Sequence, residues 1–423
     1  MEKRTFLKSL PFLGSFARSM VDPKNYKPII SPDIPAEKLA KDEKFWHSIR
    51  REFRIKPDYI NLENGYYCFV PEFTLEKFIQ HIRHINYEAS YYMRTVQGDN
   101  KRKIVKLLSK EAGCDEEELI ITRNTTESLD TVISGFPWKE GDEAIMAEQD
   151  YGSMLNQFEL LAQRKGIVNK RISVPNHPSS DEEIVWLYEK SITPRTKLIM
   201  VSHMINITGQ ILPVNKICNM AHSYGVEVLV DGAHAFGHFQ FSLSELDCDY
   251  YGTSLHKWLS APLGSGFLFV KKKHIGKIQP LFADWDLNEK SLNFLNHTGT
   301  HPVFTDLAIL NALEFQNYIG LDKKEARLRH LQNYWKEKLK ENPDVIINTP
   351  MEPHRSCAIG NIGLKNTPPG KLAHRLFQEF RIWTTAIDRE KAGVHGCRIT
   401  PNLYTTINEL DEFVNAMQYL SKV

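Results

Sequence analysis

The sequence predicts an α/β protein in which a large domain holds a mainly parallel sheet and a smaller C-terminal domain is α+β. Short apolar runs alternate with amphipathic stretches along the first three quarters of the chain, which is the pattern of a parallel sheet covered by helices on both faces. From residue 321 the pattern changes to a long charged helix followed by short strands. A chain of 423 residues is also too long for one small core and suits two domains.

The strands of the large domain are predicted from short apolar runs, because strands buried on both faces lack the polar alternation of half-exposed ones. They are expected at residues 119–122, 143–147, 171–174, 198–201, 226–230, 249–253 and 266–270. A crossover helix is predicted over residues 214–224. Pro213 precedes it and Gly225 follows it, and these are common start and stop signals.

The smaller domain is predicted to begin with a charged helix from Leu321 to about Asn342, ended by Pro343, since proline cannot continue a helix. Short strands are expected around residues 345–348 and 357–364, with helices at 369–380 and 409–420. The predicted divisions are an N-terminal arm or export signal (1–45), the large domain (46–315) and the small domain (316–423).

Composition describes an ordinary soluble globular protein. Hydrophobic residues make up 42%, charged residues 25%, and the formal net charge is +1, so the basic surface that nucleic acid requires is not expected. The six cysteines form no Cys-x-x-Cys pair, which argues neither for zinc nor for a disulfide framework. We therefore predict no metal site and no nucleic-acid partner. No apolar run approaches the ~20 residues of a membrane span.

The N-terminus leaves two predictions open. Residues 3–8, beginning Lys3-Arg4, resemble a twin-arginine export signal with lysine in place of the first arginine, and residues 9–16 form a brief apolar region. No Ala-x-Ala cleavage site follows. We expect a cytoplasmic protein with an N-terminal arm; the alternative is a periplasmic protein exported through this signal.

The most informative stretch places an aspartate and a lysine after two strand-like runs. Asp231 directly follows residues 226–230, and Lys257 comes shortly after residues 249–253. Both would lie at the carboxyl edge of a parallel sheet, where open α/β folds bind ligands. Pyridoxal phosphate needs a lysine for its Schiff base and a carboxylate against its pyridine nitrogen, and a desolvated lysine is nucleophilic near neutral pH. The alternative is a turn aspartate and a solvated surface lysine.

The motifs around this pair resemble a known family. Asp231-Gly232-Ala233-His234 and Ser254-Leu255-His256-Lys257 are similar, in this order, to elements of the class V branch of the fold type I aminotransferase superfamily, which includes cysteine desulfurases and isopenicillin N epimerase-like enzymes. The likeness runs from about residue 59 to residue 406. It implies a PLP-dependent transferase fold of type I with a seven-stranded large-domain sheet. It also implies a homodimer with the active site at the subunit interface.

The resemblance assigns residues to the cofactor phosphate. Thr125 and Thr126 follow a predicted strand and open a predicted helix, and a helix N-terminus attracts anions; the alternative role for these threonines is helix capping. Ser254 and His256 would complete the phosphate site. Thr300 lies where relatives supply a phosphate ligand from the partner subunit.

Further residues are assigned to the cofactor ring and the substrate. Tyr151 lies where many relatives stack a histidine on the ring, and an aromatic side chain can do the same. Asn206 and His234 match positions that contact the ring's 3-oxygen. Arg398 resembles the arginine that grips the substrate α-carboxylate, a bidentate contact that guanidinium geometry allows; the alternative is a structural ion pair. Asn64 is expected to line the substrate pocket.

The predicted function is that of a PLP-dependent enzyme acting at the α-carbon of an amino acid through a Lys257 Schiff base. Transamination is our first expectation, with epimerisation or carbon–sulfur lysis as alternatives. Desulfurases carry a catalytic cysteine before the arginine motif, but residues 386–396 contain none, so persulfide chemistry is disfavoured. A binding module without turnover is also disfavoured, because binding alone needs no Schiff base.

Overall fold

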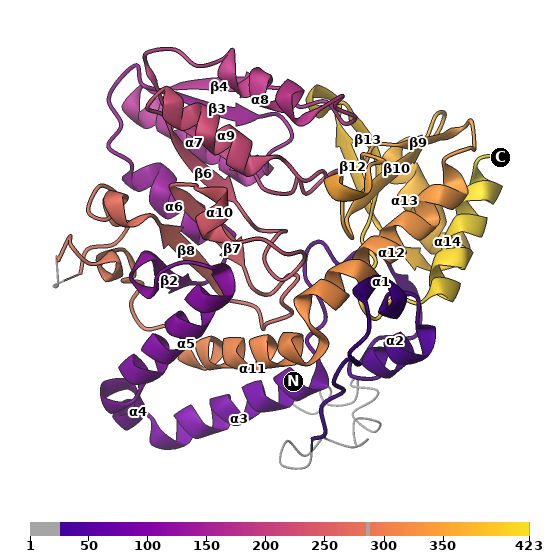
Figure 1. Cartoon of the computed structure of the whole chain (residues 1–423), viewed down its shortest axis with the longest axis horizontal. Coiled ribbons are helices and arrows are strands. Elements are labelled where there is room, and N and C mark those ends of the chain that lie inside the picture. The colour runs from indigo at the N-terminus through magenta and orange to yellow at the C-terminus, as the bar shows by residue number, and fades with distance from the viewer. Residues whose placement is uncertain (1–25, 285–287, 423) are drawn as a thin grey trace, which may run out of the picture.

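A seven-stranded sheet forms the centre of the larger lobe in the computed structural model, which describes residues 26–284 and 288–422 (Figure 1). In spatial order its strands are β2 (Leu119–Thr122), β8 (Gly266–Val270), β7 (Tyr250–Ser254), β6 (Glu227–Asp231), β5 (Thr196–Ser202), β3 (Glu143–Ala147) and β4 (Val168–Ile172). Four neighbouring pairs are parallel, and β8 is antiparallel to β2 and β7. The predicted mainly parallel, seven-stranded sheet is confirmed.

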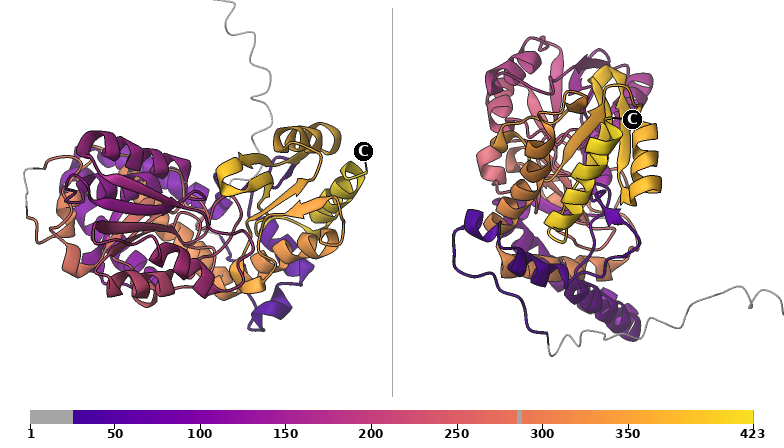
Figure 2. Two further views of the ribbon diagram at one scale, coloured as in Figure 1. Left: turned by 90° about the horizontal axis from the view of Figure 1, so that it is seen from above. Right: turned by 90° about the vertical axis from the view of Figure 1, so that its right-hand side faces the viewer.

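The sheet is buried on both faces, as the apolar runs predict. In β6, Val228 and Val230 belong to one hydrophobic core cluster and Leu229 to another. Helix α9 (Val214–Ser223) contributes to the first cluster, and α6 (Thr125–Gly135) and α7 (Gly152–Lys165) contribute to the second. Figure 2 shows helices on either side of the strands. Parallel strands covered in this way have no polar face.

One strand begins three residues and ends two residues before its predicted position. We expected residues 171–174, whereas β4 spans Val168–Ile172. The strand is at the edge of the sheet and pairs with β3, so Val168 is exposed and the next three residues are half-buried. An edge strand lacks the continuous apolar run on which the prediction depended, and the run marked its buried end.

Three long helices lie against one another beside the sheet. α11 (Val303–Ile319) packs along α3 (Glu72–Glu88) and α5 (Gln97–Ala112), and the short α4 (Ser90–Thr95) joins the latter two (Figure 1). Helix α8 (Asp181–Glu189) packs against α9.

The smaller lobe is built on a four-stranded antiparallel sheet and confirms the predicted α+β architecture. Its strand order is β12 (Thr385–Arg389), β13 (Val394–Ile399), β10 (Gly360–Leu364) and β9 (Val345–Ile347). Helices α12 (Leu321–Leu339), α13 (Pro369–Phe380) and α14 (Ile407–Leu420) enclose a core with these strands. α12 is three residues shorter than predicted, and α13 has the predicted bounds.

The segment before residue 60 packs against the rest of the protein. α1 (Ala36–Leu39) contacts α12, and Leu39 and Trp46, the latter in α2 (Glu43–Arg50), are buried. β1 (Ile60–Asn61) then pairs with β11 (Ile382–Trp383) of the smaller lobe. The divisions at residues 45 and 315 stay predictions. The export-signal candidate, residues 3–16, lies outside the described residues.

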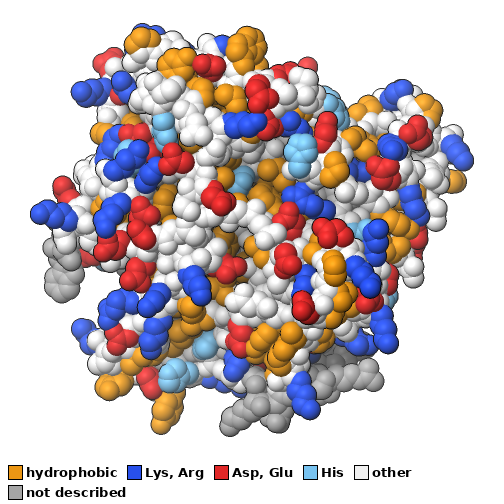
Figure 3. Space-filling model, in the orientation of Figure 1, with side chains coloured by type: hydrophobic (Ala, Val, Ile, Leu, Met, Phe, Trp, Pro, Cys, Tyr) orange, Lys and Arg blue, Asp and Glu red, His pale blue; other side chains and the backbone are white. Residues whose placement is uncertain are grey.

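Charges of both signs are interspersed on the face shown in Figure 3, in keeping with the small net charge. Among residues 26–284 and 288–422, no helix combines the length and apolar character needed to cross a bilayer.

Candidate active site

Ten of the predicted site residues line one pocket of about 760 Å³ at the carboxyl edge of the sheet. They are Thr125, Thr126, Tyr151, Asn206, Asp231, His234, Ser254, His256, Lys257 and Arg398. Asp231 is the last residue of β6, in register with Ser202 of β5 and Gly252 of β7. Trp383 and Arg398 reach the same pocket from the smaller lobe, so the site lies where the two lobes meet.

The anion-binding end of the pocket is formed by the first turn of α6 and the end of β7. Thr125 donates its backbone N–H to Ser254 Oγ at 2.9 Å, and the two hydroxyl oxygens lie 2.7 Å apart. The N-terminus of α6, capped by Asn124, adds the positive end of a helix dipole. His256 Nδ1 is buried without a hydrogen-bond partner among the described residues. The unpartnered His256 nitrogen, the two hydroxyls and the N-terminus of α6 fit a phosphate group.

Asp231 is buried with its carboxylate only partly satisfied. The backbone N–H of Ala233 donates to Oδ1 at 3.0 Å. Burial raises the pKa of Asp231, while the Ala233 N–H and the Lys257 charge lower it, and the raising effect prevails. A cationic N–H partner would offset the burial of this carboxylate. The pyridine nitrogen of pyridoxal phosphate offers such a partner, so the residue fits the cofactor.

Lys257 is buried beside Asp231 and His234. Burial lowers the pKa of Lys257 to about 8; the nearby Asp231 raises it and Arg398 lowers it. Its Nζ lies 3.2 Å from His234 Nε2. An amine with such a pKa is about one-tenth unprotonated at pH 7, and this unprotonated fraction can attack a carbonyl carbon.

Arg398 meets Glu63, a residue that the sequence analysis did not identify. Arg398 Nε donates to Glu63 Oε2 at 3.2 Å, and Nη2 donates to the other carboxylate oxygen. Nη1 donates to the backbone oxygen of Asn206 at 3.2 Å. A Cβ atom at Gly65 would lie 2.7 Å from Arg398 Cζ, so the close approach needs glycine. The structural ion pair, our alternative for Arg398, is therefore present in this structure.

Two predicted residues do not line the pocket. Asn64 is fully buried: its Nδ2 donates to Thr400 O at 2.6 Å, and its Oδ1 accepts from Tyr404 Oη at 2.7 Å. Its successors Gly65, Tyr66 and Tyr67 line the pocket instead, and Asn64 holds their loop against the smaller lobe. Thr300 is exposed and outside the pocket lining; its role toward a partner subunit stays a prediction.

Asp150 is a second buried carboxyl at this edge of the sheet that the sequence analysis did not single out. Ser202 Oγ donates to its Oδ1 at 2.7 Å, and the Ala147 N–H donates to its Oδ2 at 2.8 Å. Burial and, to a smaller extent, the Asp231 charge raise the pKa of Asp150 to about 7, against the lowering effect of its hydrogen bonds from Ser202 and Ala147.

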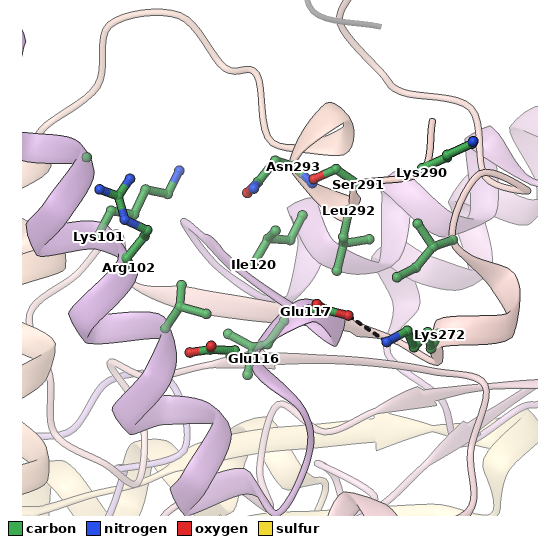
Figure 4. Close-up of a pocket in the computed structure, with 14 residues that line it drawn as sticks. Lys101, Arg102, Glu116, Glu117, Ile120, Lys272, Lys290, Ser291, Leu292 and Asn293 are labelled. Atoms are coloured by element: carbon green, nitrogen blue, oxygen red, sulfur yellow. Dashed lines mark hydrogen bonds and ion pairs between the residues drawn. The ribbon is translucent and has the colours of Figure 1, made fainter. Parts of the chain in front are cut away.

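A second cavity, of about 730 Å³, lies beside α5 and β2 and contains none of the predicted residues (Figure 4). Both acidic and basic side chains line it: Lys101 and Arg102 lie on one side, with Glu116 and Glu117 below them in the figure. Lys272 Nζ pairs with Glu117 at 2.6 Å.

Comparison with known proteins identifies the family. The profile of Aminotransferase class-V matches residues 94–413. The chain belongs to the class V aminotransferase family. Its cofactor is pyridoxal 5′-phosphate, which the residues described above fit.

Curated relatives of this class V protein include an isopenicillin N epimerase from Amycolatopsis lactamdurans, 31% identical over 73% of this chain and 82% of the relative. The isopenicillin N epimerase of Streptomyces clavuligerus is 28% identical over 89% of this chain and 98% of the relative. A probable cysteine desulfurase from Halalkalibacterium halodurans is 29% identical over 56% of this chain and 60% of the relative.

Solved structures share the fold. Cysteine desulfurase from Thermococcus onnurineus NA1 has a TM-score of 0.77 at 20% identity, covering 89% of this chain and 98% of that one. A C-DES mutant with glycine covalently linked to its PLP cofactor also has a TM-score of 0.77 at 20% identity, covering 86% and 98%. The predicted fold type I is confirmed.

Proposed function

We propose that this class V protein moves a proton at the α-carbon of an amino acid, with Lys257 as both the cofactor-binding lysine and the acid–base group. The observation that carries the proposal is the meeting of Lys257 and Asp231 in one pocket at the carboxyl edge of the sheet. When bound, pyridoxal phosphate withdraws electrons from the α-carbon and so acidifies its C–H bond. A lysine with a pKa of about 8 can then take and return that proton near neutral pH.

The surrounding residues are proposed to hold and orient the cofactor. Thr125, Thr126, Ser254 and His256 would hold its phosphate with hydroxyl, backbone and imidazole donors. Asp231 would keep the pyridine nitrogen protonated. The proposed ring contacts are Tyr151, Asn206 and His234, all of which line the pocket.

Arg398 is proposed to bind the substrate carboxylate, in competition with Glu63. Two of its donor nitrogens point to Glu63, and a bidentate carboxylate needs two adjacent donors of one guanidinium edge. A substrate carboxylate that binds in this way therefore displaces Glu63. The displaced carboxylate then lies beside the substrate, where it favours a substrate that also carries a positive charge.

Among the possible reactions we now place amino-acid epimerisation first. The two isopenicillin N epimerases match at 28% and 31% identity over most of both chains, and this moves epimerisation ahead of transamination, our first expectation from sequence. Transamination stays the second candidate because it uses the same lysine and the same acidified C–H bond, and the family is named for it.

Carbon–sulfur lysis through a persulfide is the least favoured reaction. Besides the missing cysteine in residues 386–396, the thiols near the pocket are unreactive. Cys68 and Cys397 are buried, and burial raises the pKa of each thiol to about 12. A buried thiol of this pKa provides almost no thiolate at neutral pH.

We also propose that the protein is a cytoplasmic homodimer. The assembly rests on the resemblance, which places Thr300 beside the partner's cofactor phosphate. Size measurement in solution and a Thr300→Ala variant with weakened phosphate affinity would test it.

The proposal is tested by incubating the purified protein with single amino acids in deuterium oxide. The protein should be yellow, absorbing near ~420 nm as bound pyridoxal phosphate does. Its substrate should acquire deuterium at the α-carbon. The product then identifies the reaction: an amino acid of inverted configuration indicates epimerisation, a keto acid indicates transamination, and pyruvate with sulfide indicates lysis. A protein that stays colourless after addition of pyridoxal phosphate would overturn the enzyme assignment.

A further inference from the structure

A chain of buried hydrogen bonds leads from the smaller lobe to Lys257. The backbone N–H of Ala358 donates to His238 Nε2 at 2.9 Å, and His238 Nδ1 lies 2.7 Å from the backbone oxygen of His234. The imidazole of His238 stacks on the indole of Trp258, with ring centroids 3.6 Å apart and an interplanar angle of 18°. Trp258 Nε1 in turn donates to His234 Nδ1 at 3.3 Å.

The partners in this chain determine where each imidazole carries its proton. An indole N–H and a backbone N–H can only donate. His234 Nδ1 must therefore be an acceptor, which leaves the ring proton of His234 on Nε2. By the same argument His238 Nε2 is an acceptor, so that Nδ1 of His238 carries the proton and donates to the His234 carbonyl. Neither ring has tautomeric freedom while these contacts last.

Both imidazoles are neutral. Burial lowers the pKa of His234 well below its usual range, and the charges of Lys257 and Arg398 lower it further. Burial also lowers the pKa of His238, against the opposing effect of the His234 carbonyl. His234 thus presents one N–H, from Nε2, to Lys257 Nζ at 3.2 Å.

This contact discriminates between the two forms of Lys257. A protonated lysine has three donors and no acceptor, whereas the free amine has a lone pair that can accept. A donor facing a protonated amine is unfavourable, and a donor facing the free amine makes a hydrogen bond. We propose that Trp258 is a positioning residue that fixes the His234 tautomer, so that His234 meets Lys257 as a donor and favours the free, nucleophilic amine over the protonated one.

Other groups around Lys257 act in both directions. The titratable groups that affect the pKa of Lys257 are Asp231, Arg398, Cys68 and Glu63. Asp231 and Glu63 favour the protonated amine, while burial and Arg398 oppose it. Cys68 would favour the protonated amine only as a thiolate, and with a pKa of about 12 it is a neutral thiol near pH 7. The neighbouring His256 is neutral, because burial lowers its pKa to about 4. Like burial and Arg398, the N–H of His234 favours the free amine of Lys257, and it does so without bringing another charge into the pocket.

The inference rests on the proposed role of Lys257, and its first test does not depend on turnover. Both tests use the full-length protein after its bound cofactor has been removed. For the first test the protein is ¹⁵N-labelled at histidine and examined by NMR through the two-bond couplings of its imidazoles. His234 should show a protonated Nε2 and an unprotonated Nδ1, with the resonance assigned by its loss in His234→Gln. A protonated Nδ1 in the unmodified protein would overturn the proposal even if the enzyme assignment holds.

The second test removes the indole N–H alone. Trp258→Phe keeps an aromatic ring against His238 but frees the His234 tautomer. Trp186→Phe is the matched control, because Trp186 is 55% exposed on α8. Lys257 is labelled by reductive methylation with formaldehyde and cyanoborohydride across pH 6–10, and its labelling is followed by peptide mass spectrometry. In Trp258→Phe the pH profile should move up by about one unit, which slows labelling at pH 7 by about tenfold.

A double variant distinguishes positioning from general disturbance of the pocket. In a His234→Gln background, Trp258→Phe should leave the Lys257 labelling profile unchanged, because the group through which it acts is gone. An equal shift in both backgrounds would show that Trp258 acts on Lys257 by another route and would overturn the proposal. If Trp258→Phe does not fold, the tautomer observed in the unmodified protein decides.

Discussion

Buried acidic side chains have different partners at the two edges of the seven-stranded sheet. At the amino edge, Glu143 opens β3 and pairs with Arg195 and Lys170 at 2.9 and 2.8 Å. Asp249, just before β7, accepts from His222 and His274 at 2.8 and 2.7 Å. At the carboxyl edge, Asp150 accepts from the Ser202 hydroxyl and the Ala147 N–H. Asp231 accepts from the Ala233 N–H and has the Lys257 amine nearby.

The pKa values follow this difference. Burial raises the pKa of Glu143, but hydrogen bonds from Lys170, Thr193 and Arg195 outweigh it and bring the value to about 2. Burial instead prevails at the carboxyl edge, where it raises the pKa of Asp150 to about 7 and that of Asp231 above its usual range. The acids of the amino edge are paired with side chains of the protein, and this pairing stabilises the fold. The acids of the carboxyl edge lack such partners, so a bound ligand can supply them. Perturbed acids in a pocket are typical of functional sites.

Removing the lysine of the carboxyl edge should have the largest effect. Lys257→Ala should lower turnover by more than about 10³-fold, because the cofactor anchor and the acid–base group are lost together. Its far-ultraviolet circular dichroism should match the parent protein. The control is Lys273→Ala at the amino edge, where Lys273 pairs with Asp249 at 3.2 Å; this variant should keep its activity. Turnover within tenfold of the parent in Lys257→Ala would remove the central assignment.

Neutralising the aspartate should come next. Asp231→Asn should lower the rate by about 10² to 10³-fold, a loss comparable to that of one essential electrostatic group, because an amide cannot stabilise a protonated pyridine nitrogen. Without cofactor the variant should be at least as stable as the parent, since burial disfavours the ionised carboxylate. Rates with saturating cofactor and urea unfolding without it measure the two effects. A near-normal rate would mean that the pyridine nitrogen lies elsewhere.

Arg398→Ala should separate substrate binding from the ion pair with Glu63. If Arg398 binds the α-carboxylate, kcat/KM for an amino acid should fall by about 2 to 5 kcal/mol. The corresponding amine without the carboxylate should lose much less. Arg195→Ala, which removes a guanidinium from the amino edge, is the control and should change neither. Equal losses for acid and amine would show that Arg398 serves Glu63 alone.

The sequence predicted those parts of the fold that local patterns determine. β8 and α13 have their predicted bounds. A fully buried apolar run and an amphipathic helix that begins with proline can each be identified from residues that are close together in the sequence. β4 was displaced because an edge strand has no continuous apolar run.

The candidate site divides in the same way. The Asp231 and Lys257 motifs are local, and both residues line the predicted pocket. Contacts across the chain were missed: Glu63 meets Arg398 over 335 residues of sequence, and no local pattern marks such a pair. The hydrogen bond from Trp258 to His234 was likewise missed, because it forms where two loops meet and neither motif alone predicts it.

Asp249→Asn should lower the stability of the protein by removing an ion-pair partner at the amino edge, and it should leave catalysis unchanged. Removing one partner of a buried ion pair costs about 3 kcal/mol of unfolding free energy, whereas kcat/KM should stay within about twofold of the parent, because Asp249 is at the far end of β7. Burial raises the pKa of Asp249, but its bonds to His274, His222 and the Val228 N–H hold the value below the usual range. This stabilisation is present above about pH 4 and is lost as pH falls through the folded-state pKa. The deficit of the variant in urea unfolding should therefore shrink on acidification; a constant deficit would mean a packing defect.

Asp150→Asn should show the opposite pH dependence of stability. In the folded protein the pKa of Asp150 is about 7, and an unfolded aspartate titrates near pH ~4. Between these values the folded state keeps a proton that the unfolded state releases, so this residue makes stability fall as pH rises. Asparagine removes that fall while it can still accept from the Ala147 N–H and donate to Ser202. The variant should therefore exceed the parent by about 4 kcal/mol at pH 8 and nearly equal it at pH 4. Urea unfolding at both pH values measures the difference. The stabilities of Asp150→Asn and Asp249→Asn relative to the parent should thus change with pH in opposite directions. A change in the same direction would contradict the contrast between the two edges, because Asp150 would then be as well paired as Asp249.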